Sequence, residues 1–228
     1  MDEILTLTQM AHLVSSPSRA AMLLAMSDGR ALPASELAFR AGISSQTASE
    51  HLALMKKMGI LGLEICGRHR YYRIVSHRMM ETIEDLLAVS AEVRFGERPD
   101  IARVAPLRQA RMCYDHLAGR LGVALAEQFQ KKGWFFLEGK DFQITDIGRH
   151  QLEDFGVDWP VLERSRRLLA RRCIDWSERK PHIGGAFGAF LATRFMELDW
   201  VRRSQGSRAV YATNEGRRNF LEAFGIAL

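Results

Sequence analysis

The chain has 228 residues, of which 47% are apolar, and a formal net charge of +5. This is enough apolar material to bury a real core, in one large domain or in two smaller ones. No stretch approaches the roughly 20 uninterrupted apolar residues that a membrane helix needs. The acidic start MDEILTLTQM also lacks the basic flank of a secretory signal, so we expect a cytoplasmic protein with no membrane partner.

The three cysteines, Cys66, Cys113 and Cys173, are too few and too widely spaced to staple a fold of this size with disulfides. In a reducing compartment, we expect them to be free thiols, metal ligands or redox sensors.

The first 92 residues carry helix start and stop signals in regular order. Residues 10–14 close an apolar first helix, and Ser16 caps a second helix that begins at Pro17. The segment PASELAFRAGIS predicts a short third helix that ends at Gly42. Ser44 or Ser45 then caps a fourth helix. Its buried stripe is predicted to be Ala48, Leu52, Met55 and Met58.

The third and fourth helices, joined by the short turn AGIS, match the helix-turn-helix pattern. In that pattern, the second helix presents its polar N-terminal residues to the bases of DNA. The predicted DNA-contacting residues of this helix are Ser44, Ser45, Gln46, Thr47, Ser49, Glu50 and His51.

Two β-prone runs in ILGLEICGRHRYYRI predict a hairpin wing with Arg68, His69 and Arg70 at its tip. The segment from Arg40 to Arg73 is locally basic, as phosphate binding requires. The alternative is an amphipathic helix hairpin followed by a solvated surface loop, because each motif alone has many false positives.

Three segments, SRAAMLLAMSDG, ELAFRAGISSQTASEHLALMKKMGIL and GRHRYYRI, resemble the ArsR family of winged-helix repressors over about the first 92 residues. The resemblance implies a homodimer joined through the first helix and the helix after the wing, Ser76 to Ala91. It also implies binding to an inverted repeat of double-stranded DNA, with release when an effector arrives.

The chain departs from that family at its usual sensing positions. Family metal sensors often place paired cysteines at the start of the third helix, where this chain has Pro33 and Ser35. On the dimer helix, His77 and Glu81 are too few ligands for a closed site. Glu50 stands where the family usually has a basic residue, which indicates either a cytosine contact or a weaker phosphate affinity. We therefore expect the effector to be sensed elsewhere.

The second half of the chain contains an internal repeat. HLAGRLGVAL (His116 to Leu125) aligns with HIGGAFGAFL (His182 to Leu191), and CYD at Cys113 aligns with CID at Cys173. Each copy reads as a helix, a β hairpin and a closing helix capped by Thr145 or Thr213, which is again a winged-helix-like plan.

The spacing of Cys113 and His116 suggests neighbours on one face of a helix. Pseudo-symmetry is then expected to bring the second copy of this pair nearby. The predicted effector site or redox switch consists of Cys113, His116, Cys173, Asp175 and His182. Four interpretations stay open for it: a metal site of two thiolates and two imidazoles, a redox pair, the wall of a cavity for an organic effector, or core packing. No cofactor is required other than a metal ion in the first case.

Arg164, Arg167 and Arg171 are predicted to line up on one helix face. This face is either solvated or a binding site, and its ligand would then be an acidic effector or DNA phosphates.

The sequence thus predicts a mainly α fold with small β hairpins, in the α+β class. The predicted parts are a winged helix-turn-helix domain (1–92), a linker (93–108) and a C-terminal domain (109–228) of two winged-helix-like repeats (109–157 and 161–228). We expect a transcriptional repressor. The alternatives are a constitutive DNA-binding protein and, least favoured, a cysteine-dependent enzyme, for which no accompanying catalytic motif is found.

Overall fold

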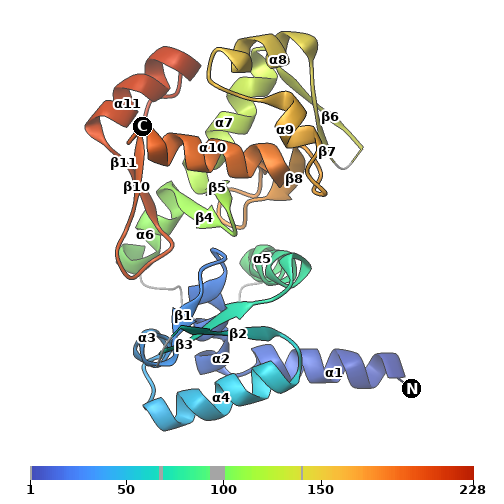
Figure 1. Cartoon of the computed structure of the whole chain (residues 1–228), viewed down its shortest axis with the longest axis vertical. Coiled ribbons are helices and arrows are strands. Elements are labelled where there is room, and N and C mark those ends of the chain that lie inside the picture. Colours follow the sequence, from blue (N-terminus) through green and yellow to red (C-terminus); the bar gives the residue numbers. More distant parts are fainter. Residues whose placement is uncertain (1, 67–68, 93–100, 140) are drawn as a thin grey trace. The chain divides into compact units, whose positions relative to one another are not determined.

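A computed structural model describes residues 2–66, 69–92, 101–139 and 141–228 (Figure 1). The chain divides into two compact units, Met1–Ile83 and Glu84–Leu228. Helices combined with short antiparallel strands make up both units, which confirms the predicted α+β class. None of the described helices is long and apolar enough to cross a membrane.

The first unit is built on four helices, and the next helix contains the boundary between the units. In chain order, these helices are α1 (Asp2–Val14), α2 (Pro17–Met26), α3 (Ala34–Ala41), α4 (Ser45–Lys57) and α5 (His77–Glu92). Their capping follows the sequence signals. The Ser16 hydroxyl accepts a hydrogen bond from the backbone N–H of Arg19 at 3.4 Å, and Gly42 ends α3 with a φ of 65°, in the left-handed region.

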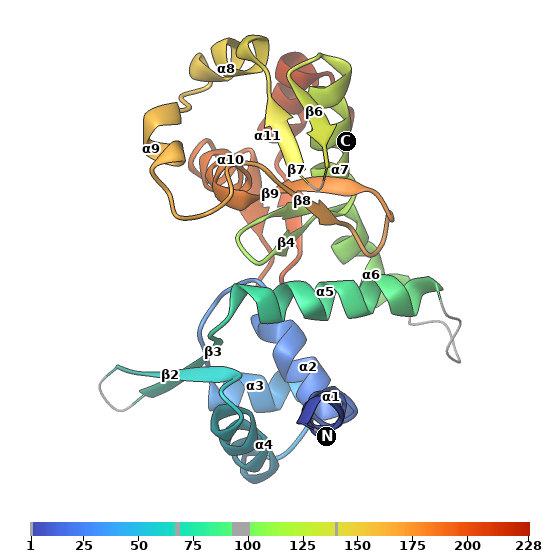
Figure 2. The same cartoon turned by 90° about the vertical axis from the view of Figure 1, so that its right-hand side faces the viewer.

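A three-stranded antiparallel sheet completes the first unit, with strand order β1-β3-β2. Its strands are β1 (Leu32–Pro33), β2 (Leu61–Cys66) and β3 (His69–Ile74). Cys66 pairs with His69 at the end of β2 and β3. The predicted turn at Gly67 and Arg68 lies outside the described residues. Figure 2 shows β2 and β3 extending away from α2 and α3 as a ribbon, as expected for a wing.

The first helix that lies entirely in the second unit is α6 (Ile101–Gln109), and all but its last residue fall in the segment that the sequence assigned to a linker. This helix tolerates Pro106 in its interior and packs against α7 and β11. The remaining part of the predicted linker, residues 93–100, lies outside the described residues.

The two repeats follow α6, and each begins with a small β hairpin that the sequence did not predict. The first consists of β4 (Arg111–Cys113), β5 (His116–Ala118), α7 (Gly119–Lys131), β6 (Phe135–Glu138), β7 (Asp141–Ile144) and α8 (Asp146–Glu153). A short helix, α9 (Trp159–Glu163), connects it to the second. The second consists of β8 (Arg171–Ile174), β9 (Pro181–Gly184), α10 (Gly185–Glu197), β10 (Val201–Arg203), β11 (Val210–Ala212), α11 (Asn214–Asn219) and a π-helical turn, η1 (Phe220–Phe224).

The predicted helix, hairpin and closing helix are present in both repeats, and the caps are the predicted ones. Thr145 caps α8 by accepting from the N–H of Gly148 at 3.0 Å, and Thr213 caps α11 by accepting from that of Gly216 at 2.9 Å. The missed element is the small hairpin that precedes α7 and α10.

These small hairpins are exchanged between the repeats. Hairpin β8–β9 joins the β6–β7 hairpin of the first repeat in a four-stranded sheet, through the pairing of Arg171 with Asp141. Hairpin β4–β5 in turn bridges to the second repeat, where Arg111 pairs with Ala209. One sheet and one isolated bridge thus connect the two repeats, which form one unit.

Two of the shared glycines allow this close packing. A Cβ added to Gly122 would lie 2.3 Å from the carbonyl oxygen of Leu117, and one added to Gly188 would lie 2.3 Å from that of Ile183. The Gly188 position also faces the other repeat, at 3.1 Å from the Cβ of His116. The glycines are thus needed where α7 and α10 meet the small hairpins.

One predicted element is wrong. Residues 164–170 form turns and bends between α9 and β8, and Arg171 lies in β8, so Arg164, Arg167 and Arg171 do not share a helix face. Helix α9 ends at Glu163, so Arg164 and Arg167 lie on irregular backbone and Arg171 lies on a strand.

Candidate functional site

The first candidate site is the N-terminal half of α4. The Ser44 hydroxyl accepts a hydrogen bond from the N–H of Thr47 at 3.1 Å, which caps the helix. The apolar stripe Ala48, Leu52 and Met55 is buried. The opposite face therefore stays accessible. Among the predicted DNA-contacting residues of α4, those that are exposed are Ser44, Ser45, Gln46, Ser49 and Glu50, and those that are half-buried are Thr47 and His51.

The wing supplies the positive charge of this site. Arg70 is exposed on β3 opposite Ile65, and the predicted wing residue His69 begins the same strand. Arg68 lies outside the described residues. Arg73 makes an ion pair with Glu64 across the two strands, so its charge is partly offset. The geometry provides a capped polar helix end and a basic ribbon within the same unit.

The second candidate site lies where the small hairpins of the two repeats meet. Cys113 and His116 are cross-strand partners at the end of hairpin β4–β5, and Cys173 and His182 are cross-strand partners in hairpin β8–β9. The expectation that Cys113 and His116 share a helix face is therefore wrong. A two-residue hairpin turn also places residues i and i+3 side by side, which explains why the spacing was ambiguous.

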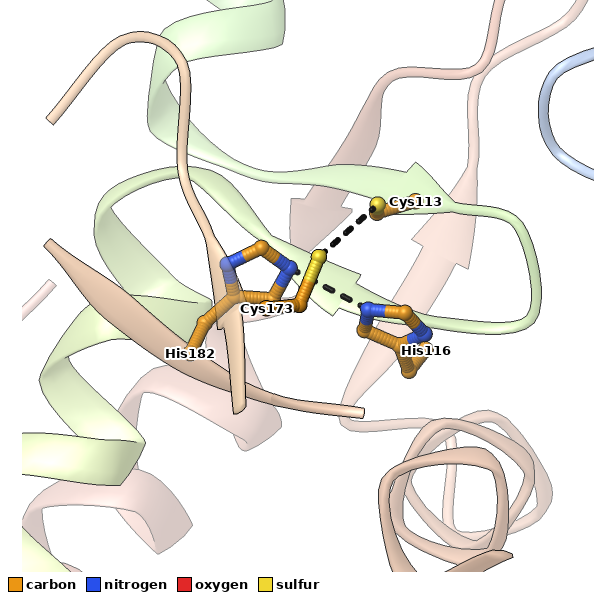
Figure 3. A group of neighbouring side chains, drawn as sticks. All are labelled: Cys113, His116, Cys173 and His182. Atoms are coloured by element: carbon orange, nitrogen blue, oxygen red, sulfur yellow. Dashed lines mark hydrogen bonds between the residues drawn. The ribbon is translucent and has the colours of Figure 1, made fainter. Parts of the chain in front are cut away.

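These four side chains, here called the Cys–His cluster, point toward one another (Figure 3). The two sulfur atoms lie 3.9 Å apart, and the Nε2 atoms of the two histidines lie 3.2 Å apart. One donor atom from each of the four residues lies within 4.8 Å of all the others. Cys113, His116 and His182 are buried, and Cys173 is half-buried. The thiols are free, because a disulfide requires a sulfur separation of about 2 Å.

The electrostatics of the cluster favour a neutral Cys113 thiol as long as nothing binds it. The hydrogen bond with Cys173, together with burial, raises the pKa of the Cys113 thiol to about 12. Burial opposes a positive charge on His116, but the Cys113 sulfur and the Asp115 carboxylate outweigh it and raise its pKa. Because the Cys113 thiol is uncharged at neutral pH, the Asp115 carboxylate is the group that raises the pKa of His116 there.

Asp115 is a part of the site that the sequence analysis missed. Its carboxylate lies 3.4 Å from the Nδ1 atom of His116 and is held by the guanidinium of Arg167, at 3.2 Å for Arg167 Nη2. Burial would raise the pKa of Asp115, but the hydrogen bonds to His116 and Arg167 lower it below its usual value. The repeated Cys-x-Asp element was the available signal, but it drew attention to Asp175 instead.

Asp175 does not join the cluster, although it was expected there. Its buried carboxylate lies 2.9 Å from Arg111 Nη2 and accepts hydrogen bonds from the N–H groups of Gly119, Ser177 and Glu178, and from the Ser177 hydroxyl. Burial would raise the pKa of Asp175, but Arg111 and these hydrogen bonds lower it to about 2. Asp175 therefore neutralises a buried arginine and anchors the loop between β8 and β9.

The space around the cluster bears on the idea of an organic effector. The cavity between the repeats, lined by Leu117, Leu125 and Ile183 among others, has a volume of about 10 Å³, which is room for one water molecule. A larger groove of about 440 Å³ is lined by Ala110, Tyr211 and Arg217 among others, but by no residue of the cluster. The small cavity is not lined by a residue of the cluster either, and three of the four cluster side chains are buried, so the cluster is suited to a small species such as an ion or an oxidant.

Comparisons with known proteins identify the type of domain that contains the first site. Residues 14–63 match a family described as a helix-turn-helix domain. The HTH-type transcriptional regulator YdfF of Bacillus subtilis (strain 168) is 36% identical over 222 residues, which cover 97% of this chain and 98% of YdfF.

Two solved structures resemble part of the chain. One is a predicted DNA-binding transcriptional regulator from E. coli, 24% identical, with a TM-score of 0.35, covering 39% of this chain and 93% of that one. The other is the AntR antimony-specific transcriptional repressor, 25% identical, also with a TM-score of 0.35, covering 40% of this chain and 79% of that one.

Proposed function

Because the chain belongs to the family of HTH-type transcriptional regulators, we propose that it is a homodimeric repressor whose effector acts in the C-terminal unit. Its N-terminal part resembles the ArsR family. The dimer binds an inverted-repeat operator and leaves it when the effector arrives. The observation that carries this proposal is the presence of two separate sites, an exposed polar helix end in the first unit and the buried Cys–His cluster in the second.

The DNA-binding part of the proposal assigns two roles. The exposed residues at the start of α4 contact base edges, because a recognition helix enters the major groove with its N-terminal turn. Gln46 is the residue best suited to an adenine, since its amide can donate and accept at once. Arg70 on the wing, with Arg68 and His69, contacts phosphates and adds affinity without choosing a sequence.

Dimerisation follows from the limited reach of one winged helix, which reads too few base pairs for useful specificity. We assign the interface to α1 and α5. Leu86 and Val89 on α5 are 49% and 57% exposed, so this helix keeps apolar side chains that a second copy would cover.

We expect sedimentation at micromolar concentration to show a dimer, and footprinting on the DNA upstream of the chain's own gene to show an imperfect palindrome. Two-fold protein symmetry requires this palindrome, with half-sites about one helical turn apart. Leu86→Lys should shift the sedimentation toward the monomer and weaken operator binding, while Leu168→Lys, at another exposed leucine, serves as the control. A wild-type monomer on an asymmetric site would contradict the proposal.

A further inference from the structure

We infer that Cys113, His116, Cys173 and His182 form a tetrahedral site for a zinc-class divalent ion, with one Cys–His pair supplied by each repeat. The inference deepens the proposed function by giving the chemical class of the effector, and it rests on that function only for the consequence at the operator. The site lies in the second unit, whereas the positions at which family metal sensors usually bind their ions, Pro33, Ser35, His77 and Glu81, lie in the first.

The spacing of the donor atoms carries the inference. Zinc bonds of about 2.3 Å to sulfur and about 2.0 to 2.1 Å to imidazole nitrogen, arranged tetrahedrally, imply edges of about 3.8 Å between two sulfurs and about 3.3 Å between two nitrogens. The corresponding distances here are 3.9 Å between the sulfurs and 3.2 Å between the Nε2 atoms. Two of the six edges of the tetrahedron thus have about the required length before any ion binds, and the other donor pairs lie within 4.8 Å of one another.

The backbone makes this arrangement reproducible. In each hairpin, the Cys and the His are directly opposite each other, so the sheet register fixes one pair of ligands. The glycine at position 188 lets α10 approach His116, and the glycine at 122 lies in the equivalent place near His182. The repeat therefore explains why the same ligand pair occurs twice.

The chemistry of the donors selects the class of ion. Two thiolates and two neutral imidazoles suit zinc, cadmium or cobalt, whereas magnesium and calcium require oxygen ligands. Trivalent arsenic or antimony would prefer three thiolates, and this cluster has only two. With a divalent ion, two thiolates and two neutral histidines, the buried complex has no net charge, which avoids the large cost of burying an unpaired ion.

The surroundings of His116 match those of a metal ligand. Asp115 lies at its Nδ1 atom, so a proton held at that position would let Nε2 give its lone pair to an ion once that ion displaces any proton on Nε2. Arg167 holds the carboxylate in turn. Carboxylate partners of this kind orient metal-binding histidines, and removing one typically costs about 10- to 100-fold in metal affinity.

The test is a titration of the reduced, metal-free full chain with Co²⁺ under anaerobic conditions, without DNA. We expect one cobalt per chain, with a thiolate charge-transfer band and the strong visible bands of tetrahedral cobalt, and displacement by Zn²⁺. Cys113→Ser and Cys173→Ser should each weaken cobalt binding by more than about 100-fold. That is the upper limit for removing a residue that only hydrogen-bonds to a metal ligand. Asp115→Asn should weaken it about 10- to 100-fold and keep the tetrahedral spectrum.

The matched control is Cys66→Ser, because Cys66 is an exposed cysteine in the first unit and should leave the titration unchanged. Circular dichroism checks the fold of each variant. If Cys113→Ser does not fold, Cys173→Ser at the half-buried position carries the test.

Several results would overturn the inference: no cobalt binding, a spectrum without thiolate bands, or full binding by the folded cysteine variants. A wild type that takes up no cobalt but forms a Cys113–Cys173 disulfide with a mild oxidant would show a redox switch instead. Because no DNA is present, failure of the proposed repressor function would leave the titration unchanged.

Discussion

Asp175→Asn should destabilise the second unit by about 3 to 5 kcal/mol, because it removes the closer of the two carboxylates that face the buried guanidinium of Arg111. The other carboxylate, that of Glu84, lies 3.8 Å away and is shared with Arg208. Arg111 and Asp175 are both fully buried. The substitution keeps the shape of the side chain but removes the charge. It also places an amide group where acceptors are needed by the N–H of Gly119 and by Ser177. An effect of this size is a large part of the stability of a typical domain.

Urea denaturation followed by tryptophan emission measures this effect selectively, because all four tryptophans (Trp134, Trp159, Trp176 and Trp200) lie in the second unit. Asp199→Asn is the matched control. Asp199 also pairs with an arginine, Arg202, but both side chains are about half exposed, so water replaces the lost contact. Equal denaturation midpoints for the wild type and Asp175→Asn would show that the buried pair does not hold this unit together.

Gln46→Ala should remove much of the discrimination between the operator and other DNA. A bidentate contact between an amide and an adenine is worth about 1 to 3 kcal/mol of discrimination. In the proposed dimer, the contact is lost in both half-sites, so the loss should be about 2 to 6 kcal/mol. The measurement is the ratio of the dissociation constants for the operator and for a shuffled duplex, at one fixed salt concentration.

Arg70→Ala is the comparison for this prediction. A phosphate contact carries no sequence information, so this variant should weaken both duplexes alike and flatten the salt dependence by about one phosphate per wing. If Gln46→Ala also weakened both duplexes by the same factor, Gln46 would be a phosphate-contacting or structural residue, and the assignment of α4 to base contacts would fail.

The parts of the fold that the sequence predicted well are those with strong local signals. Ser16, Pro17, Gly42 and Ser44 mark helix ends by local hydrogen bonding and backbone conformation, and the helices occur where these residues predict them. The repeat was likewise visible, because both copies need glycine at the same tight approaches, such as positions 122 and 188.

The parts that were missed depend on contacts distant in sequence. Hairpins β4–β5 and β8–β9 are too short for a clear alternation of apolar residues, and their further backbone pairing is with the other repeat, through Asp141 for β8 and through an isolated bridge to Ala209 for β4. The grouping of Cys113, His116, Cys173 and His182 was predicted from the repeat. The different roles of Asp115 and Asp175 were not, because Arg167 reaches the first and Arg111 the second only in the folded unit.

Release from DNA tests the central claim that the Cys–His cluster in the C-terminal unit controls operator binding. The measurement is the fluorescence anisotropy of labelled operator DNA with the reduced full chain, with and without Zn²⁺, for the wild type, Cys66→Ser and the double variant Cys113→Ser/Cys173→Ser. A ligand shifts such an equilibrium only if it binds one arrangement of the protein better than the other. We predict that zinc raises the dissociation constant for the wild type and for Cys66→Ser, while the double variant binds equally well with and without zinc. Zinc-driven release of the double variant to the same extent as the wild type would contradict this account, because the zinc that acts on DNA binding would then lie outside the Cys–His cluster.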